Sequence, residues 1–136
     1  IPTSVTLIEN YAFFGCSSLK EITIPSSVTE IERHAFSKCT SLKQITIPSS
    51  VTIIGNYAFS YCTSLTELFL PSSVQKIGDY AFFECSSLTK ISIPSLVTSI
   101  GEHAFYKCPS LTQLLIPSSI NTSYLVFDKE TTIKRI

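Results

Sequence analysis

The feature that most constrains how this chain can fold is a motif that returns every 23 residues without a slip. An Ile-Pro or Leu-Pro pair begins at Ile1, Ile24, Ile47, Leu70, Ile93 and Ile116. Self-similarity with a fixed period of about 20 to 50 residues is the signature of a stack of like structural units. We therefore interpret the chain as a single domain of five repeats and a divergent last segment: 1–23, 24–46, 47–69, 70–92, 93–115 and 116–136.

Within one repeat, two apolar periodicities indicate two kinds of local structure. In the first repeat, apolar residues between Ile8 and Cys16 fall at i, i+4, i+5 and i+8, which is one face of a short helix. From Ile22 to Ile24 apolar residues instead alternate with a polar one, and Pro25 closes the run, which predicts a short strand. Each repeat is therefore expected to form a strand, a turn and a helix of about two turns.

A single repeat cannot fold alone, because burying its few apolar side chains returns less free energy than ordering its backbone costs. Stacking makes up the difference and places each strand about 4.8 Å from its counterpart in a parallel ladder. Because helices are wider than strands, the stack is expected to curve. The predicted fold class is α/β: a solenoid with a parallel strand ladder on its concave face and short helices on its convex face.

A longer motif resembles a known family. The unit from Leu19 to Cys39, which follows the pattern Leu-x-x-Ile-x-Ile-Pro-Ser-Ser-Val-Thr-x-Ile-x-x-x-Ala-Phe-x-x-Cys, is similar to the BspA-like class of leucine-rich repeats. Its core recurs across residues 1–115, although the Asn that follows the strand in more familiar leucine-rich repeats is missing. The resemblance implies a right-handed superhelix in a surface or secreted protein of bacteria or protozoan parasites. Some members bind extracellular-matrix proteins or mediate adhesion.

The last segment departs from the repeat after Ile120. It loses the Ala-Phe-x-x-Cys core and reads as an apolar run at 124–127, a charged turn at 128–130 and a second alternating run at 131–136. Strand, turn and strand are expected, forming a cap over apolar surface that a bare solenoid end would expose. The amino end has no such segment. We expect missing native chain to cover it, or two such ends to meet in an end-to-end dimer.

The five cysteines occupy one position in successive repeats: Cys16, Cys39, Cys62, Cys85 and Cys108. Neighbours about 4.8 Å apart fall within the disulfide range, but parallel side chains disfavour a bridge and the odd number leaves one thiol over. Free thiols buried in the core are the interpretation we favour. Because no Cys-x-x-Cys is present, the sequence predicts no metal site, and it gives no sign of a cofactor.

No residue pattern indicates catalysis. His34 and His103 stand three repeats apart where other repeats carry Tyr, so we expect aromatic packing, with an exposed aromatic stripe as the functional alternative. The recurring serines lack a Gly-x-Ser-x-Gly motif and are expected to bond to backbone in turns. Gly55, Gly78 and Gly101 occur singly, without the pattern of a phosphate loop, and are expected at turns or helix starts.

Charge and hydropathy exclude several classes of partner. Ten basic and ten acidic residues give a net charge of zero, so no global field draws the chain to nucleic acid or to an anionic membrane. No apolar run approaches the roughly 18 residues that a membrane helix needs, which argues against direct insertion. Asn121 begins a glycosylation sequon, a short pattern that is common by chance.

The most informative residues are strand positions 21 and 23 of each repeat, which point away from the predicted helices. They are expected to form a partner-binding surface on the concave side: Glu21, Thr23, Gln44, Thr46, Glu67, Phe69, Lys90, Ser92, Gln113 and Leu115. Most are small or polar, but Phe69 and Leu115 are apolar, and buried aromatic anchors often dominate binding energy. The alternatives are tolerated drift, or cover of Leu115 by the last segment.

These features favour a protein-binding or adhesion module whose concave strand face meets a macromolecular partner, with its centre at Glu67, Phe69, Lys90 and Ser92. Through the resemblance, the partner is expected to be an extracellular-matrix or host surface protein, and the chain is expected at the cell surface or secreted. The runner-up is a structural spacer array without a ligand of its own, favoured by how little the repeats differ. No enzymatic activity is expected.

Overall fold

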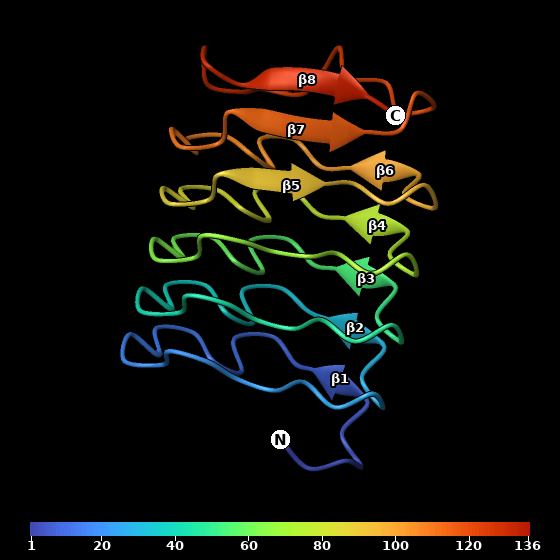
Figure 1. Ribbon diagram of the computed structural model, residues 1–136. Coiled ribbons are helices and arrows are strands. Elements are labelled where there is room, and N and C mark those ends of the chain that lie inside the picture. The colour runs from blue at the N-terminus through green and yellow to red at the C-terminus, as the bar shows by residue number, and fades with distance from the viewer.

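The computed structural model describes all residues, 1–136. The chain forms a solenoid (Figure 1). Each repeat forms one turn of the solenoid, here called a coil and numbered 1 to 5 in chain order. The C-terminal segment, 116–136, stacks on coil 5 at the far end from residue 1. Every coil therefore contacts only its neighbours along the stack, as the 23-residue period predicts.

Eight short strands lie in two parallel ladders that run along the stack. The first ladder joins β1 (Leu7–Ile8), β2 (Glu30–Ile31), β3 (Ile53–Ile54), β4 (Lys76–Ile77) and β6 (Ser99–Ile100). The second joins β5 (Lys90–Ser92), β7 (Gln113–Ile116) and β8 (Thr132–Arg135). Single parallel bridges extend the second ladder down through coils 1 to 3: Thr23 with Thr46, Thr46 with Phe69, and Glu67 with Lys90. In coils 1 to 5, paired residues are 23 apart, so the coils stack in register.

The second ladder confirms the predicted strand at positions 22 to 24, whereas the predicted helix is wrong. No helix is present, and residues 10–15 of coil 1 form consecutive turns. Positions 11 and 15 of every coil have positive φ, as at Tyr57 (58°) and Tyr61 (60°), a conformation that a right-handed helix excludes. The chain is thus a parallel-strand solenoid and not an α/β protein with helices on the convex face.

Backbone hydrogen bonding explains why turns replace the helix. In coil 1 the amides of Tyr11, Phe13 and Gly15 donate to carbonyls of coil 2, while those of Ala12 and Phe14 close turns within coil 1. Alternate amides therefore bond along the stack, and too few remain for a helical series. The apolar spacing i, i+4, i+5, i+8 describes the inward side of two successive turns, and Ile8, assigned to that helix, lies in β1.

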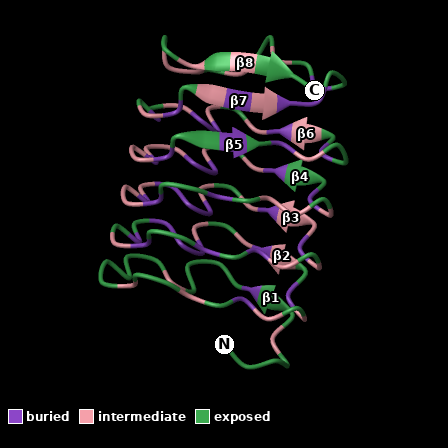
Figure 2. Ribbon diagram, viewed as in Figure 1, coloured by how far each residue is buried: buried purple, intermediate pink, exposed green.

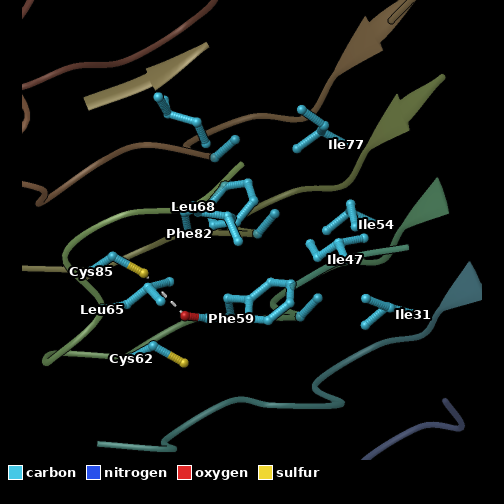
Figure 3. Close-up of a cluster of buried hydrophobic side chains, with 14 of the residues drawn as sticks. Ile31, Ile47, Ile54, Phe59, Cys62, Leu65, Leu68, Ile77, Phe82 and Cys85 are labelled. Atoms are coloured by element: carbon cyan, nitrogen blue, oxygen red, sulfur yellow. Dashed lines mark hydrogen bonds between the residues drawn. The ribbon is translucent and has the colours of Figure 1, made fainter. Parts of the chain in front are cut away.

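The core is a set of columns in which one residue type repeats up the stack. Figure 2 shows the buried segments of successive coils lying above one another. The phenylalanines at position 13 stack face to face, with ring centroids 5.1 Å apart between Phe13 and Phe36 and 5.3 Å apart between Phe36 and Phe59. Figure 3 shows Phe59 and Phe82 beside the inward isoleucines of the first ladder, Ile54 and Ile77. Phe59 and Phe82 are fully buried, so the repeated apolar positions form one continuous core.

Two sets of small residues let the coils approach closely. A Cβ atom added to Gly78 would lie 2.6 Å from the backbone nitrogen of Asn56, so only glycine fits where these coils touch. Serine hydroxyls do bond to backbone, as expected, but to the preceding coil: Ser50 donates to the carbonyl of Val28, and Ser73 donates to that of Val51 at 2.6 Å. These serines therefore join coils as well as shape turns.

The C-terminal segment contains one strand instead of the two that its sequence predicts. β8 extends the second ladder beyond β7, while 122–125 form a turn and 126–128 have no regular structure. Phe127 continues the phenylalanine column above Phe105, with ring centroids 6.5 Å apart. The guanidinium of Arg135 donates to the carbonyls of Pro117 and Ile120 and so holds the start of the segment against its end.

Candidate partner-binding surface

The ten predicted binding residues lie on one surface, formed by positions 21 and 23 of the second ladder and called here the 21/23 face. Strand alternation sends positions 22 and 24 inward, as at Ile91, which is buried, and leaves positions 21 and 23 outside. Both positions are exposed in coils 1 to 4, as the prediction requires. At coil 5, Gln113 and Leu115 are half-buried because β8 pairs alongside them.

Phe69 is the outlier of the 21/23 face. Its side chain is 77% exposed, more than any other large apolar side chain of the protein. The same position carries Thr46 one coil earlier and Ser92 one coil later, and both are small. The ring therefore stands between two hollows, one of about 180 Å³ shared with coil 2 and one of about 420 Å³ shared with coil 4.

The larger hollow also carries opposite charges. Glu67 and Lys90 are bridge partners on coils 3 and 4, both are exposed, and both line the hollow together with Phe69. They form no ion pair with each other: the one ion pair of the chain joins Lys107 to Glu84. Leu70 and Pro94 complete an apolar side. The hollow thus combines an exposed aromatic ring, a carboxylate and an ammonium group within two neighbouring coils.

Leu115, the other apolar residue of the 21/23 face, is placed differently. It pairs with Lys134 of β8 and is half-buried, whereas Phe69 has small neighbours on both sides. Cover by the last segment, the alternative weighed from the sequence, therefore explains Leu115. No such cover lies over Phe69, so the candidate surface narrows to coils 3 and 4.

The cysteine column is free of disulfides, as predicted, but Cys16 is exposed, so the predicted burial of the thiols is wrong in coil 1. Four thiols are buried, and each donates to the carbonyl of the phenylalanine 26 residues earlier, as Cys85 does to Phe59 at 3.1 Å (Figure 3). Burial raises the pKa of Cys39 to about 11 and that of Cys108 to about 12. These thiols are therefore protonated structural groups, unsuited to nucleophilic work at neutral pH.

Both histidines pack in an aromatic column, as predicted, although this column lies on turns and not on helices. His34 lies between Tyr11 and Tyr57, with ring centroids 4.8 and 4.7 Å away, and His103 stacks on Tyr80 at 5.0 Å. The rings of His34, Tyr57, Tyr80 and His103 are half-buried, and that of Tyr11 in coil 1 is exposed. No group of three His, Cys, Asp or Glu side chains is placed to hold a metal ion. No helix long and apolar enough to span a membrane is present.

Sequence reasoning missed a second varied surface, on the first ladder. Position 7 reads Leu, Glu, Ile, Lys and Ser in successive coils, while position 8 is always Ile. A polar hollow of about 360 Å³ lies here, lined by residues that include Glu30, Arg33, Ile53 and Lys76. Because position 7 varies while position 8 does not, the sequence could have predicted a strand at 7–8. Instead, the spacing of Ile8 from the following apolar residues led to its assignment to a helix.

The fold defines a repeat scaffold of the leucine-rich type. It has parallel ladders, core columns with one residue from each coil, and an outward face that varies from coil to coil. The model of the BspA type leucine rich repeat region matches six copies in this chain, over residues 1–112 and 54–136. The chain belongs to that family. No curated protein matches the sequence.

Solved structures of bacterial repeat proteins have the same fold. A leucine-rich repeat protein from Bacteroides ovatus is 30% identical over the whole chain, with a TM-score of 0.84. A leucine rich cell surface protein from Faecalibacterium prausnitzii is 37% identical over 85% of the chain, with a TM-score of 0.63, and the chain covers 38% of that protein. The pneumococcal vaccine antigen PcpA, 19% identical over 98% of the chain with a TM-score of 0.81, is similar in fold. The chain covers 41% of the Bacteroides protein and 35% of PcpA, well under half of either.

Proposed function

We propose that this chain is a protein-binding module that recognises its partner through the 21/23 face of coils 3 and 4. The observation that carries the proposal is Phe69, an aromatic ring 77% exposed where the neighbouring coils carry Thr46 and Ser92. A scaffold does not need that ring, and its exposure to water is unfavourable until a partner covers it. Aromatic residues at the centre of interfaces supply much of the binding free energy.

The location we propose is the cell surface or the medium outside the cell, with the 21/23 face as the concave side. The name of the Faecalibacterium relative, a leucine rich cell surface protein, supports a surface location. The partner is then an extracellular-matrix or host surface protein, in keeping with an adhesion role. A zero net charge also leaves recognition to local contacts and favours neither nucleic acid nor membrane.

A binding screen on an array of purified extracellular-matrix and cell-surface proteins tests the proposal. Wild-type chain is compared with Phe69→Ala and Lys90→Glu, which remove the ring and reverse the charge in the hollow. The matched controls are Tyr124→Ala, which removes an exposed ring in the C-terminal segment, and Lys43→Glu, which reverses an exposed charge outside the 21/23 face. We expect at least one captured protein to be lost by both hollow variants and kept by both controls.

The competing function is a spacer array that projects another domain and has no ligand. The similarity of the repeats favours it, because most fixed positions serve the core. Capture that is equal for the wild type and both hollow variants would remove the 21/23 face as a binding site. Capture of nothing on the array would favour the spacer.

A further inference from the structure

The hollow beside Phe69 also carries information about the kind of partner. We infer that its ligand is a linear polypeptide segment, with an aromatic or leucine anchor beside Phe69 and with charges that pair with Glu67 and Lys90. This inference rests on the proposed function and specifies the chemistry of its partner. Three features of the hollow support it: its size, its arrangement of charge, and the lack of free backbone groups.

Size favours a single anchor side chain. The hollow measures about 420 Å³, near the lower end of the roughly 300–1,000 Å³ of small-ligand pockets. It exists because Ser92 is small at the position that carries Phe69 one coil earlier. A partner side chain in this space would lie against the Phe69 ring and against Leu70 and Pro94. Contact there would remove apolar surface of both partners from water.

Charge favours a segment with both signs near its anchor. Glu67 and Phe69 lie on the same side of one extended segment, two residues or about 6.6 Å apart, and Lys90 lies one coil away from Glu67, about 4.8 Å. Each charge has no ion-pair partner within the chain. An extended segment that follows the strand advances about 6.6 Å in two residues, so its charged side chains can reach the pair while its anchor reaches Phe69.

Backbone pairing is excluded as the mode of recognition at this site. The amide of Thr66 donates to the carbonyl of Lys43, that of Thr89 donates to Thr66, and that of Ile93 donates to Leu115. Coils 3 and 4 are therefore bonded on both sides, and a peptide cannot add to them as another strand. Recognition must depend on side chains, which makes the ring and the two charges decisive.

Selection from a phage-displayed library of random linear peptides tests this inference. On the wild-type chain, we expect enriched peptides to carry an aromatic or leucine residue with an acidic and a basic residue within about three positions. Synthetic peptides from the selection should bind Phe69→Thr and Ser92→Phe about 30-fold more weakly, the loss typical of a hot spot. Position 23 holds Thr in coils 1 and 2 and Phe in coil 3, so both variants use residues that the fold already accommodates.

A charge exchange makes the test sharper. The double variant Glu67→Lys with Lys90→Glu keeps the net charge and exchanges the two signs. Glu67 and Lys90 occupy the same position of neighbouring coils, so the acidic and basic residues of a peptide should lie on one side of its anchor, and their order should be reversed in peptides selected on the double variant. The control Tyr124→Ala removes an exposed ring in the C-terminal segment, outside the 21/23 face, and should change affinity by less than about twofold.

Several outcomes would overturn the inference while sparing the proposed function. No enriched peptide, equal binding to Phe69→Thr, or the same charge order on the exchanged variant would each do so. If the array proteins are still captured in a Phe69-dependent manner, the partner is a folded surface instead of a linear segment. If that capture is also independent of Phe69, the proposed function fails as well.

Discussion

The two ends of the solenoid carry the same repeat but differ in burial. In coil 5 the thiol of Cys108 and the ring of Phe105 are buried, because the C-terminal segment stacks on them. The equivalent residues of coil 1, Cys16 and Phe13, are exposed and half-buried, and coil 1 is largely exposed in Figure 2. A residue of this fold is therefore buried by its neighbouring coils and not by its own, which makes position along the stack a determinant of stability and reactivity.

Thiol labelling should give the largest difference between the ends. We expect Cys16 to react with a maleimide in the folded protein, while Cys62 and Cys85 react only through opening, at least about 1,000-fold more slowly. Burial raises the pKa of both buried thiols, which lowers the reactive thiolate fraction further. Mass spectrometry of labelled peptides measures each rate, and equal rates in native buffer would contradict the stack.

The same experiment bears on the amino end. Coil 1 exposes apolar side chains, among them Ile1 and Leu7, and the expected dimer through this end stays a prediction. If two such ends meet, labelling of Cys16 should slow as protein concentration rises, while labelling after denaturation should not. A rate independent of concentration would argue against the dimer.

Truncating a phenylalanine should affect the centre of the stack more than coil 1. Phe59→Ala removes a fully buried ring stacked on Phe36 and on Phe82, so we expect a loss of about 3–5 kcal/mol in the free energy of unfolding. Phe13→Ala removes a half-buried ring with one stacking neighbour and should cost less than about 2 kcal/mol. Urea denaturation measures both losses, and equal losses would contradict burial by neighbours.

The sequence predicts the stack better than it predicts the path of each coil. The period, the strand at 22–24 and the inward side of each repeat follow from residue spacing, because apolar side chains must face the core whatever the backbone does. The turn conformation does not follow from spacing, since Tyr57 and Tyr61 have positive φ that their residue type does not suggest. Turns form instead of a helix because alternate amides of each coil bond to carbonyls of the neighbouring coil, and this pairing is not visible in the spacing of one repeat.

The candidate surface was predictable to a similar degree. Strand alternation identifies all ten residues of the 21/23 face, and the repeat comparison singles out Phe69 and Leu115. The comparison cannot tell these two apart, because the cover over Leu115 comes from a segment that does not follow the repeat. It also cannot show that Ser92, beside Phe69, opens a hollow, since that depends on the register of coils 3 and 4.

Weakening the C-terminal segment should lower the free energy of unfolding less than truncating a core side chain does. Arg135→Ala removes the hydrogen bonds that the guanidinium donates to the carbonyls of Pro117 and Ile120 and to the hydroxyl of Thr122. Their loss should destabilise the C-terminal segment by about 1.5–3 kcal/mol. Amide hydrogen exchange at Ile136, whose N–H donates to Ile116, should then speed up. Lys134→Ala, an exposed neighbour on β8, is the control and should leave that exchange rate nearly unchanged.

The smallest expected effect is a loss of stability in acid through His34. Its Nδ1 atom is buried without a hydrogen-bond partner between the rings of Tyr11 and Tyr57. Desolvation, with lesser contributions from the positive charges of Arg33 and Lys38, lowers the pKa of His34 below its usual 6.5. The folded state therefore binds the proton less well than the unfolded chain does.

The sign of the pH dependence follows from that difference. The stabilising contribution is present above the unfolded pKa of 6.5 and is lost as pH falls through the lowered pKa of the folded state. Urea denaturation at pH 7.5 and 5.0 should thus show a larger acid loss for the wild type than for His34→Tyr, which places there the residue of coils 1, 3 and 4. An acid loss in His34→Tyr as large as in the wild type would show that the aromatic column accepts the charged imidazole without penalty. Its stacking would then stabilise the cation as well as the neutral ring.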